Sequence, residues 1–143
     1  MKLYLLRHGE AEPYRSDDAS RALTRVGCDA VVTRGEALAP VDQLFCSPYV
    51  RARQSADLVQ QRLGQNIQIE PLLTPDQPVK AVIDWLQTLP EGDTCLIGHN
   101  PLLSQLANTL LGESSTVSLS TAGLVCLEAD AWYPGGATLS FQH

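Results

Sequence analysis

The 143-residue sequence has no apolar run long enough to cross a lipid bilayer, and it has no secretory signal at its start. A single lysine is followed at once by a strand-like segment, without the longer apolar stretch and cleavage site of a signal peptide. Repeats, low-complexity tracts and linkers are also absent. We therefore expect a cytoplasmic protein with one domain, residues 1–143, because this length suits a single substantial core.

Basic residues are scarce, since 10 Lys and Arg stand against 16 Asp and Glu and give a formal net charge of −6. This balance argues against broad binding to nucleic acid or to acidic membranes, although charges that face a pocket can still bind an anion locally. The four cysteines have none of the close spacings of metal fingers or redox motifs. Cys46, Cys95 and Cys126 lie in apolar runs, which predicts buried free thiols.

Short apolar segments alternate with amphipathic ones along the whole chain. Strands are expected at residues 2–6, 42–46, 67–70, 93–97, 122–128 and 136–141. Helices are expected at residues 24–38, 49–63, 78–88 and 101–111. This alternation predicts an α/β fold, a compact three-layer α/β/α sandwich with a mainly parallel central sheet and no inserted subdomain. The turn at Gly135 and Gly136 predicts that the last two strands pair antiparallel at one edge.

Polar clusters that contain His or Arg directly follow three of the predicted strands. These clusters are Arg7-His8-Gly9-Glu10, Ser47-Pro48-Tyr49-Val50-Arg51-Ala52 and Gly98-His99-Asn100-Pro101. Ligands of open α/β sheets bind at the carboxyl ends of the strands, so these clusters are expected to meet there. Arg51 would lie in the first turn of its helix, near backbone amides that attract anions.

Phosphoryl transfer is the chemistry that these side chains suit. It needs an in-line nucleophile and positive charge on the equatorial oxygens. His8 can supply the nucleophile, and Arg7, Arg51 and His99 can supply the charge. Attack requires a neutral imidazole, which neighbouring guanidinium groups are expected to favour in His8. The alternatives are that His8 binds a metal ion and that His99 caps the following helix.

The three clusters resemble the motifs of the histidine phosphatase superfamily, which are Arg-His-Gly, then Ser-x-x-x-Arg-Ala, then a second Gly-His or Ser-His. They occur in that order between Arg7 and Asn100. The resemblance implies that His8 becomes phosphorylated and that Arg7, Arg51 and His99 form the phosphate pocket, where phosphate or sulfate could bind. It also implies that water then releases phosphate without a metal ion or another cofactor.

Three further polar residues are expected to have no part in the chemistry. Arg53 is two residues from Arg51, so it points to another face of the helix, where we expect an exposed ion pair. Ser47 is expected to cap the helix, since no base is evident beside it. The terminal His143 is expected to be disordered.

A general acid is the least evident part of the site. Superfamily members that act on sugar phosphates or phosphoglycerate carry a Glu for this purpose in an insertion after the third strand, where this chain has only residues 70–76. Glu10, Asp18 and Asp76 remain as candidates. A phosphohistidine substrate relaxes the requirement, because the departing imidazole takes a proton on its own ring.

Within the superfamily the chain is most similar to the small SixA-type phosphohistidine phosphatases. The similarity includes the late Gly-His-Asn-Pro motif and a Leu-Thr-x-x-Gly motif, here from Leu23 to Gly27. Many members have Arg-Pro-Leu where this chain has Ala22, and Arg21 is retained as a candidate substrate contact. The implied function is metal-independent removal of phosphate from phosphohistidine on a protein such as a phosphorelay carrier domain. The alternatives are a phosphatase of small phosphoesters and a non-catalytic phosphate-binding module.

Overall fold

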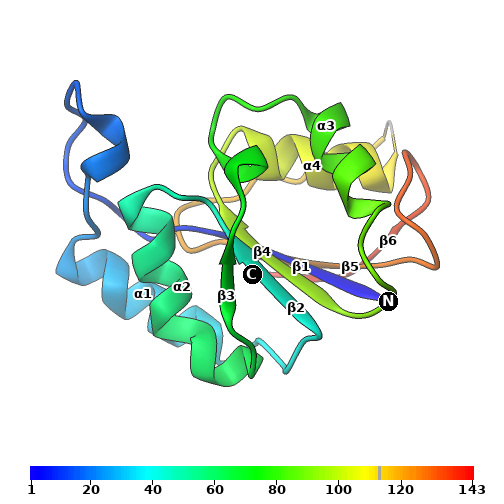
Figure 1. Ribbon diagram of the computed structural model, residues 1–143, viewed down its shortest axis with the longest axis horizontal. Helices are drawn as coiled ribbons and strands as arrows, with labels where there is room; N and C mark the ends of the chain where they lie inside the picture. Colours follow the sequence, from blue (N-terminus) through cyan, green and yellow to red (C-terminus); the bar gives the residue numbers. More distant parts are fainter. Residues whose placement is uncertain (113) are drawn as a thin grey trace.

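A central sheet of six strands organises the computed structural model, which describes residues 1–112 and 114–143 (Figure 1). The strands are β1 (Lys2–Arg7), β2 (Gln43–Cys46), β3 (Ile67–Ile69), β4 (Thr94–Gly98), β5 (Leu124–Glu128) and β6 (Thr138–Gln142). Their spatial order is β3-β2-β4-β1-β5-β6. The first four run parallel, whereas β5 pairs antiparallel with both β1 and β6. The predicted mainly parallel sheet and its antiparallel edge are both confirmed.

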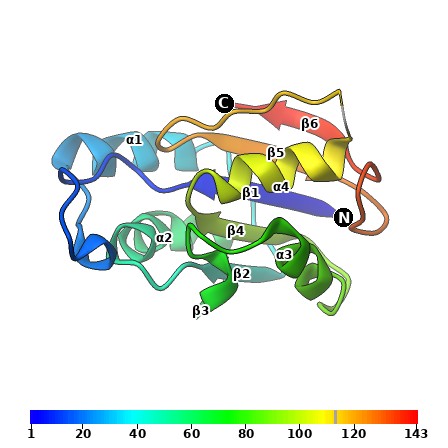
Figure 2. The ribbon, with the colours of Figure 1, turned by 90° about the horizontal axis from the view of Figure 1, so that it is seen from above.

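Two pairs of helices cover the two faces of this sheet and complete the α/β/α sandwich (Figures 1 and 2). The pair on one face is α1 (Arg25–Gly35) and α2 (Val50–Leu63), and the pair on the other is α3 (Val79–Leu86) and α4 (Leu102–Leu111). Two short 3₁₀ helices, η1 (Asp18–Ser20) and η2 (Pro71–Leu73), lie in the connections. The first helix ends at Gly35 and not at the predicted residue 38, because the N–H groups of residues 36–38 bond to carbonyls three residues back and not four.

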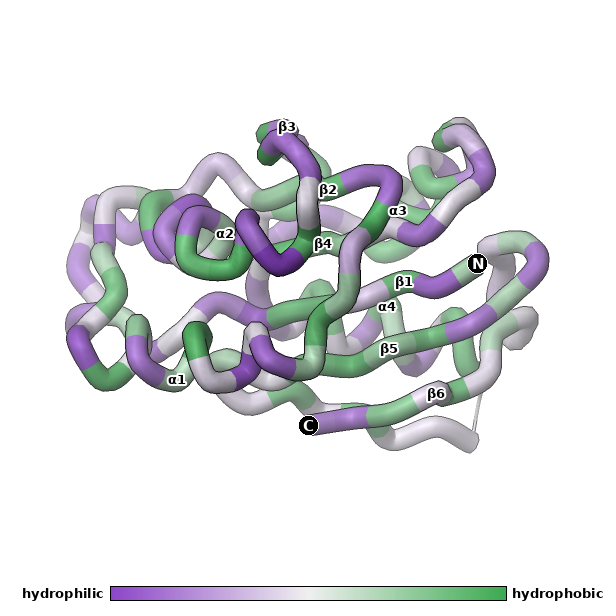
Figure 3. Tube along the Cα trace, turned by 90° about the horizontal axis from the view of Figure 1, so that it is seen from below, coloured by the Kyte–Doolittle hydropathy of each residue, from purple (hydrophilic) through white to green (hydrophobic). Residues whose placement is uncertain are grey.

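Successive strand residues pack on opposite sides of the sheet, which gives the sandwich two apolar cores. Leu3 and Leu5 of β1 pack in the core beneath α3 and α4, while Tyr4 and Leu6 pack in the core beneath α1 and α2. Figure 3 shows hydrophobic residues along the inner strands β4 and β5. Strands covered on both faces are expected to be apolar throughout, and this explains the short apolar runs of the sequence.

The register of the parallel strands brings the three polar clusters to one end of the sheet. Arg7 of β1 lies beside Gly98 of β4, and Cys46 of β2 lies beside Ile97 of β4. The ladder extends one residue further, because the backbone N–H of His8 donates to Gly98 O at 2.9 Å. Ser47 N–H similarly donates to Ile97 O at 3.0 Å. His8, Ser47 and His99 therefore emerge together from three adjacent strands.

The C-terminal residue is ordered, so the prediction of disorder at His143 is wrong. Its backbone N–H donates to Leu124 O at 2.8 Å, and its carbonyl accepts from Leu124 N at 3.0 Å. These bonds extend the pairing of β5 and β6 to the last residue, which holds the terminus in place. Cys46, Cys95 and Cys126 are buried, as the apolar runs around them predict. Among the described helices, none is long and apolar enough to span a membrane.

Candidate active site

A hollow of about 400 Å³ opens at the carboxyl ends of β1, β2 and β4. Its walls come from the loop after β1, the start of α2 and the segments that follow η2 and β4. The lining residues are Arg7, His8, Glu10, Ala11, Tyr14, Asp18, Arg21, Arg51, Pro75, His99, Asn100 and Thr121. Every site residue predicted from the sequence lines this hollow except Asp76, which is exposed to solvent next to Pro75.

His8 lies at the floor of the hollow, 7% exposed, with both ring nitrogens in contact with neighbouring groups. Nδ1 is 2.7 Å from Gly9 O, and Nε2 is 3.3 Å from Nε of Arg51. A carbonyl oxygen only accepts hydrogen bonds, so this geometry assigns the ring hydrogen to Nδ1. Nε2 therefore keeps its lone pair and is the ring atom suited to nucleophilic attack.

Burial lowers the pKa of His8 to about 4, against the opposing effect of the hydrogen bond to Gly9. The charges of Arg51, Arg7 and Arg21 lower this pKa further. The guanidinium groups were expected to keep the imidazole neutral, but loss of solvation is the larger cause of the lowered pKa. Both effects lower the pKa of His8, so its ring is uncharged at neutral pH.

The loop that carries His8 is held against the start of α1. Thr24 caps this helix by accepting a hydrogen bond from Gly27 N at 3.0 Å, and its own N–H donates to Glu10 O at 3.0 Å. A side chain at position 27 would collide with the backbone of Glu10, so only glycine allows this close approach. The Leu-Thr-x-x-Gly motif thus fixes the backbone directly after His8.

Arg51 is the second residue of α2 and is 3% exposed. Its Nη1 donates to Asp18 O at 2.8 Å, and its Nη2 donates to the carboxylate of Asp18 at 3.2 Å. Because Nε of Arg51 also donates to Nε2 of His8, all three guanidinium nitrogens have hydrogen-bond partners. The guanidinium carbon also lies 5.0 Å from the ring centroid of Tyr49. Arg51 is therefore held in one orientation beside His8.

Arg7 and His99 line the hollow, and each has a buried nitrogen without a hydrogen-bond partner among the described residues. Arg7 donates through Nη1 to Leu119 O at 3.0 Å, which leaves its Nε unpaired. His99, 1% exposed, contacts Ser47 Oγ through Nε2 at 2.7 Å, which leaves its Nδ1 unpaired. Buried polar groups are usually paired, so two such nitrogens at one hollow indicate a place for an external acceptor.

The contact between Ser47 and His99 is compatible with a ring hydrogen on Nδ1 of His99. The hydroxyl oxygen of Ser47 accepts from Tyr49 N at 3.2 Å and can donate its own hydrogen to Nε2 of His99. In that arrangement Nδ1 of His99 carries the ring hydrogen. The prediction that Ser47 caps the helix is wrong, because the N-cap of α2 is Tyr49. His99 is not a cap either, since α4 begins after Pro101 without a side-chain cap.

Asn100 also belongs to the site, although no role was predicted for it from the sequence. Its Nδ2 donates to Leu119 O at 2.7 Å, the same carbonyl that accepts from Arg7. Its Oδ1 accepts from the hydroxyl of Ser104 at 2.8 Å. Asn100 thus holds the backbone against which Arg7 is oriented. Its position next to His99 in the third polar cluster is the sequence feature that could have indicated this role.

The loop between β1 and α1 forms the mouth of the hollow and leaves the sheet at the end opposite the N-terminus (Figure 2). Arg21 donates through Nε to the Asp18 carboxylate at 2.7 Å and through Nη1 to Glu12 O at 2.7 Å. Burial raises the pKa of Asp18, but hydrogen bonds and charges of Arg21 and Arg51 outweigh it and lower the pKa overall. Asp18 is therefore ionised at neutral pH and is unsuited to the role of general acid.

Arg53 is exposed, as expected for the other face of α2. The expected ion pair does not form: none of the salt bridges within the described residues includes Arg53. Residues 53–57 offer only Asp57 as an acid, one full turn away on the same exposed face. Arg53 thus provides a natural control for Arg51.

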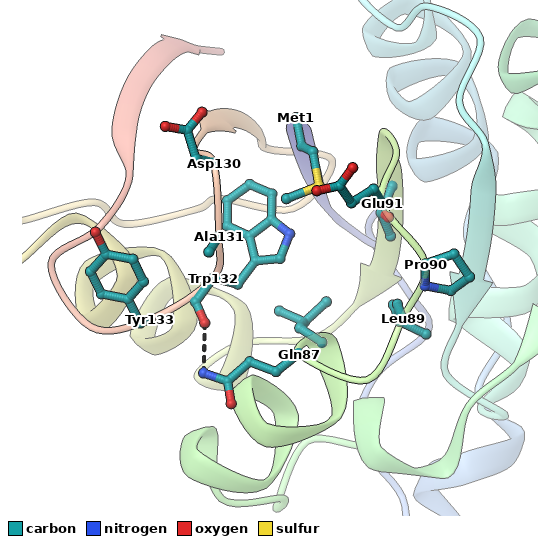
Figure 4. A pocket seen from close by; sticks show the side chains of 11 residues that line it. Met1, Gln87, Leu89, Pro90, Glu91, Asp130, Ala131, Trp132 and Tyr133 are labelled. Atoms are coloured by element: carbon teal, nitrogen blue, oxygen red, sulfur yellow. Dashed lines mark hydrogen bonds between the residues drawn. The ribbon is translucent and has the colours of Figure 1, made fainter.

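A second hollow, of about 330 Å³, lies at the opposite end of the sheet, where β1 and β4 begin (Figure 4). Its walls are mainly apolar and include Met1, Leu86 and Trp132. Glu91 and Asp130 line it, but no Arg, Lys or His side chain does. The cationic groups suited to phosphate thus belong to the hollow around His8. In the described part of the chain, no three His, Cys, Asp or Glu side chains form a potential metal site.

The family model of the histidine phosphatase superfamily (branch 1) matches residues 3–74 of the chain. This span is about half of the sequence and includes the clusters of His8 and Arg51. The chain belongs to the histidine phosphatase superfamily. The protein is accordingly a phosphatase with the fold of this superfamily.

Several SixA proteins are similar to this phosphatase over nearly its whole length. The phosphohistidine phosphatase SixA homolog of Haemophilus influenzae is 29% identical, with 89% of this chain and 87% of the relative covered. The phosphohistidine phosphatase SixA of Escherichia coli is 28% identical, with 99% and 92% covered. The structure of a protein histidine phosphatase SixA in complex with tungstate superimposes with a TM-score of 0.86 at 26% identity, covering 99% of this chain and 96% of that chain.

Proposed function

We propose that this phosphatase removes the phosphoryl group from phosphohistidine on a protein, such as a phosphorelay carrier domain, and that it needs no metal ion. The observation that carries the proposal is the arrangement of His8. Its Nε2 has a lone pair and lies at the floor of a hollow, with cationic or N–H donors from Arg7, Arg51 and His99 around it. The SixA relatives, which act on phosphohistidine, and the tungstate bound by one of them support this choice.

In the first step, Nε2 of His8 attacks phosphorus while the bond from phosphorus to the leaving nitrogen breaks. The buried N–H groups of Arg7 and His99 and the guanidinium of Arg51 stabilise charge on the three nonbridging oxygens. The hydrogen on Nδ1 stays hydrogen-bonded to the carbonyl of Gly9. The ring therefore accepts the phosphoryl group at Nε2 without first losing a proton. In the second step, water attacks phosphorus, His8 leaves as neutral imidazole, and phosphate departs.

The carboxylates at the hollow favour a substrate that brings its own proton. An alkoxide leaving group needs an acid, whereas the imidazole of phosphohistidine carries a proton on its second nitrogen. Asp18 is ionised by its two arginines, and Asp76 lies outside the hollow. Glu10 lines the mouth and is the remaining candidate acid, which keeps small phosphoesters as the second candidate substrates.

The open mouth suits a phosphorylated side chain presented by a protein. The segment between β3 and α3 contains only η2 and a short loop, so no further layer covers the hollow. Tyr14 is 76% exposed at the rim, and its ring lies 5.8 Å from the guanidinium carbon of Arg21. Aromatic and arginine side chains are enriched where proteins bind one another. We therefore assign Arg21 and Tyr14 to contact with the substrate protein.

The decisive experiment follows phosphate release from a carrier domain labelled with ³²P on histidine, alongside a panel of sugar phosphates and phosphoglycerate. We expect a higher kcat/KM on the phosphohistidine protein. Rapid quenching in alkali should trap the label on the enzyme, at His8 in a peptide digest. A clear preference for a small phosphoester, or a label at another residue, would contradict the proposal.

A further inference from the structure

Asp18 joins two arginines of the site through one carboxylate. Oδ1 accepts from Nε of Arg21 at 2.7 Å, and Oδ2 accepts from Nη2 of Arg51 at 3.2 Å. A carboxylate has about four lone-pair positions, so acceptor capacity remains on both oxygens after these two bonds. The side chain is 29% exposed and lines the same hollow as His8. Asp18 can therefore accept a further hydrogen bond from a molecule that enters the hollow.

The guanidinium of Arg51 lies between Asp18 and the nucleophile. Its Nε faces Nε2 of His8, while Nη1 and Nη2 face the backbone carbonyl and the carboxylate of Asp18. His8 is buried at the floor, and Asp18 is part of the exposed mouth. In an in-line transfer the leaving group stands opposite the nucleophile. Attack from the floor therefore directs the leaving group toward the mouth, where Asp18 lies.

We propose that Asp18 is a specificity-determining residue that makes the site favour phosphoryl groups leaving from an imidazole over those leaving from an alcohol. This inference rests on the function proposed above. Asp18 would accept the N–H on the second ring nitrogen of phosphohistidine and so hold the ring in its cationic form. The free imidazole group titrates at a pKa of roughly 6.5, so a modest electrostatic effect changes its protonation near neutral pH.

The protonated ring makes the bond exchange balance without an enzymic acid. The phosphorus–nitrogen bond breaks, and its electron pair stays on the ring nitrogen. Nε2 of His8 forms the new bond to phosphorus, and a neutral imidazole that bears one N–H departs. If the second nitrogen lacked its proton, the leaving group would be an imidazolate anion. Asp18 thus acts on the leaving group while it remains ionised throughout.

The same carboxylate disfavours phosphate esters. Its negative charge beside Arg51 repels any dianionic phosphoryl group. The cationic ring of phosphohistidine offsets this repulsion, whereas the neutral alcohol part of an ester does not. An ionised carboxylate also has no proton to give to a departing alkoxide. Removal of this charge should therefore have opposite effects on the two classes of substrate.

The test replaces Asp18 by Asn and compares a phosphohistidine carrier domain with p-nitrophenyl phosphate. In the D18N variant we expect kcat/KM on phosphohistidine to fall about tenfold, while kcat/KM on the ester stays level or rises. Inorganic phosphate should inhibit the variant at a lower concentration. The basic limb of the pH profile for phosphohistidine should also move to lower pH, because the substrate ring loses its proton sooner.

Asp17→Asn is the matched control, because it removes the same charge from the same loop. The Asp17 side chain is exposed and makes no capping bond to η1, so both activities should stay at the wild-type level. Parallel losses on both substrates in D18N would show that Asp18 only orients Arg51, and this would overturn the inference. Failure of the wild-type protein on phosphohistidine would instead overturn the proposed function. Circular dichroism verifies that both variants are folded.

Discussion

Replacement of Arg51 by alanine, with Arg53→Ala as its internal control, tests the phosphate pocket directly. The two residues carry the same charge on the same helix, but Arg51 is buried against His8 and Asp18 while Arg53 is exposed. If the Arg51 guanidinium stabilises the transferring phosphoryl group, its loss should lower kcat/KM about 10³-fold. This corresponds to about 4 kcal/mol of transition-state stabilisation. Arg53→Ala should change kcat/KM less than about twofold, because its charge is solvated.

Initial rates of ³²P release from a phosphohistidine carrier domain provide the measurement, with thermal melting to verify the fold of each variant. Arg51→Lys adds a second comparison. It restores the charge but not the fork of nitrogens that contacts His8 and Asp18, so its rate should lie between those of wild type and Arg51→Ala. Equal losses for Arg51→Ala and Arg53→Ala would mean that only net charge matters, and the assigned pocket would be refuted.

Three further outcomes follow from the site. His8→Ala should lower turnover by several orders of magnitude without unfolding the protein, because His8 lies at a strand end outside both apolar cores; residual activity above roughly a tenth would rule out the phosphohistidine intermediate. The pKa of His8 is about 4 in the folded protein and near 6.5 when unfolded, so the unfolded chain binds more protons between these values. The free energy of unfolding, measured by urea titration, should therefore fall on acidification through this range, by about 2 kcal/mol at pH 5 for His8 alone. His8→Asn should remove this pH-dependent loss. If the variant shows the same dependence of unfolding free energy on pH as the wild type, the lowered pKa is wrongly assigned to His8. Activity should persist in EDTA, since Arg7, Arg51 and His99 occupy the role that Mg²⁺ has in other phosphoryl-transfer sites; loss in EDTA with recovery on adding Mg²⁺ or Zn²⁺ would contradict this.

The parts of the fold that the sequence predicts are those set by local periodicity. Buried strands such as β1 and β4 have a continuous apolar centre, and each ends where the polar cluster begins. That boundary is a property of adjacent residues, so it can be found without knowledge of the fold. Parallel pairing then aligns the strand ends, which explains why His8, Arg51 and His99 were assigned to one edge. The register alone brings His8 and His99 together, whereas Arg51 also depends on where α2 begins after β2.

The roles of Asp18 and Ser47 were missed because they depend on contacts between segments far apart in the sequence. Asp18 meets Arg51 across 33 positions, and Ser47 meets His99 across 52. A carboxylate in a loop is an acid candidate on chemical type alone, and only its distance from two guanidinium groups shows that it stays ionised. Asp76 was placed in the site by its position in the chain, yet its neighbour Pro75 lines the hollow and Asp76 does not.

Net charge is an equally indirect guide to what this hollow binds. The chain carries −6 overall, yet Arg7, Arg21 and Arg51 converge at one end of the sheet against the carboxylates of Asp18 and Glu10. Salt screens charges beyond about 8 Å at physiological ionic strength, so acidic residues elsewhere on the surface have little effect there. An anionic ligand is therefore selected by the few charges within that distance of His8. Those charges are brought together by the loop after β1 and the start of α2, which total composition does not determine.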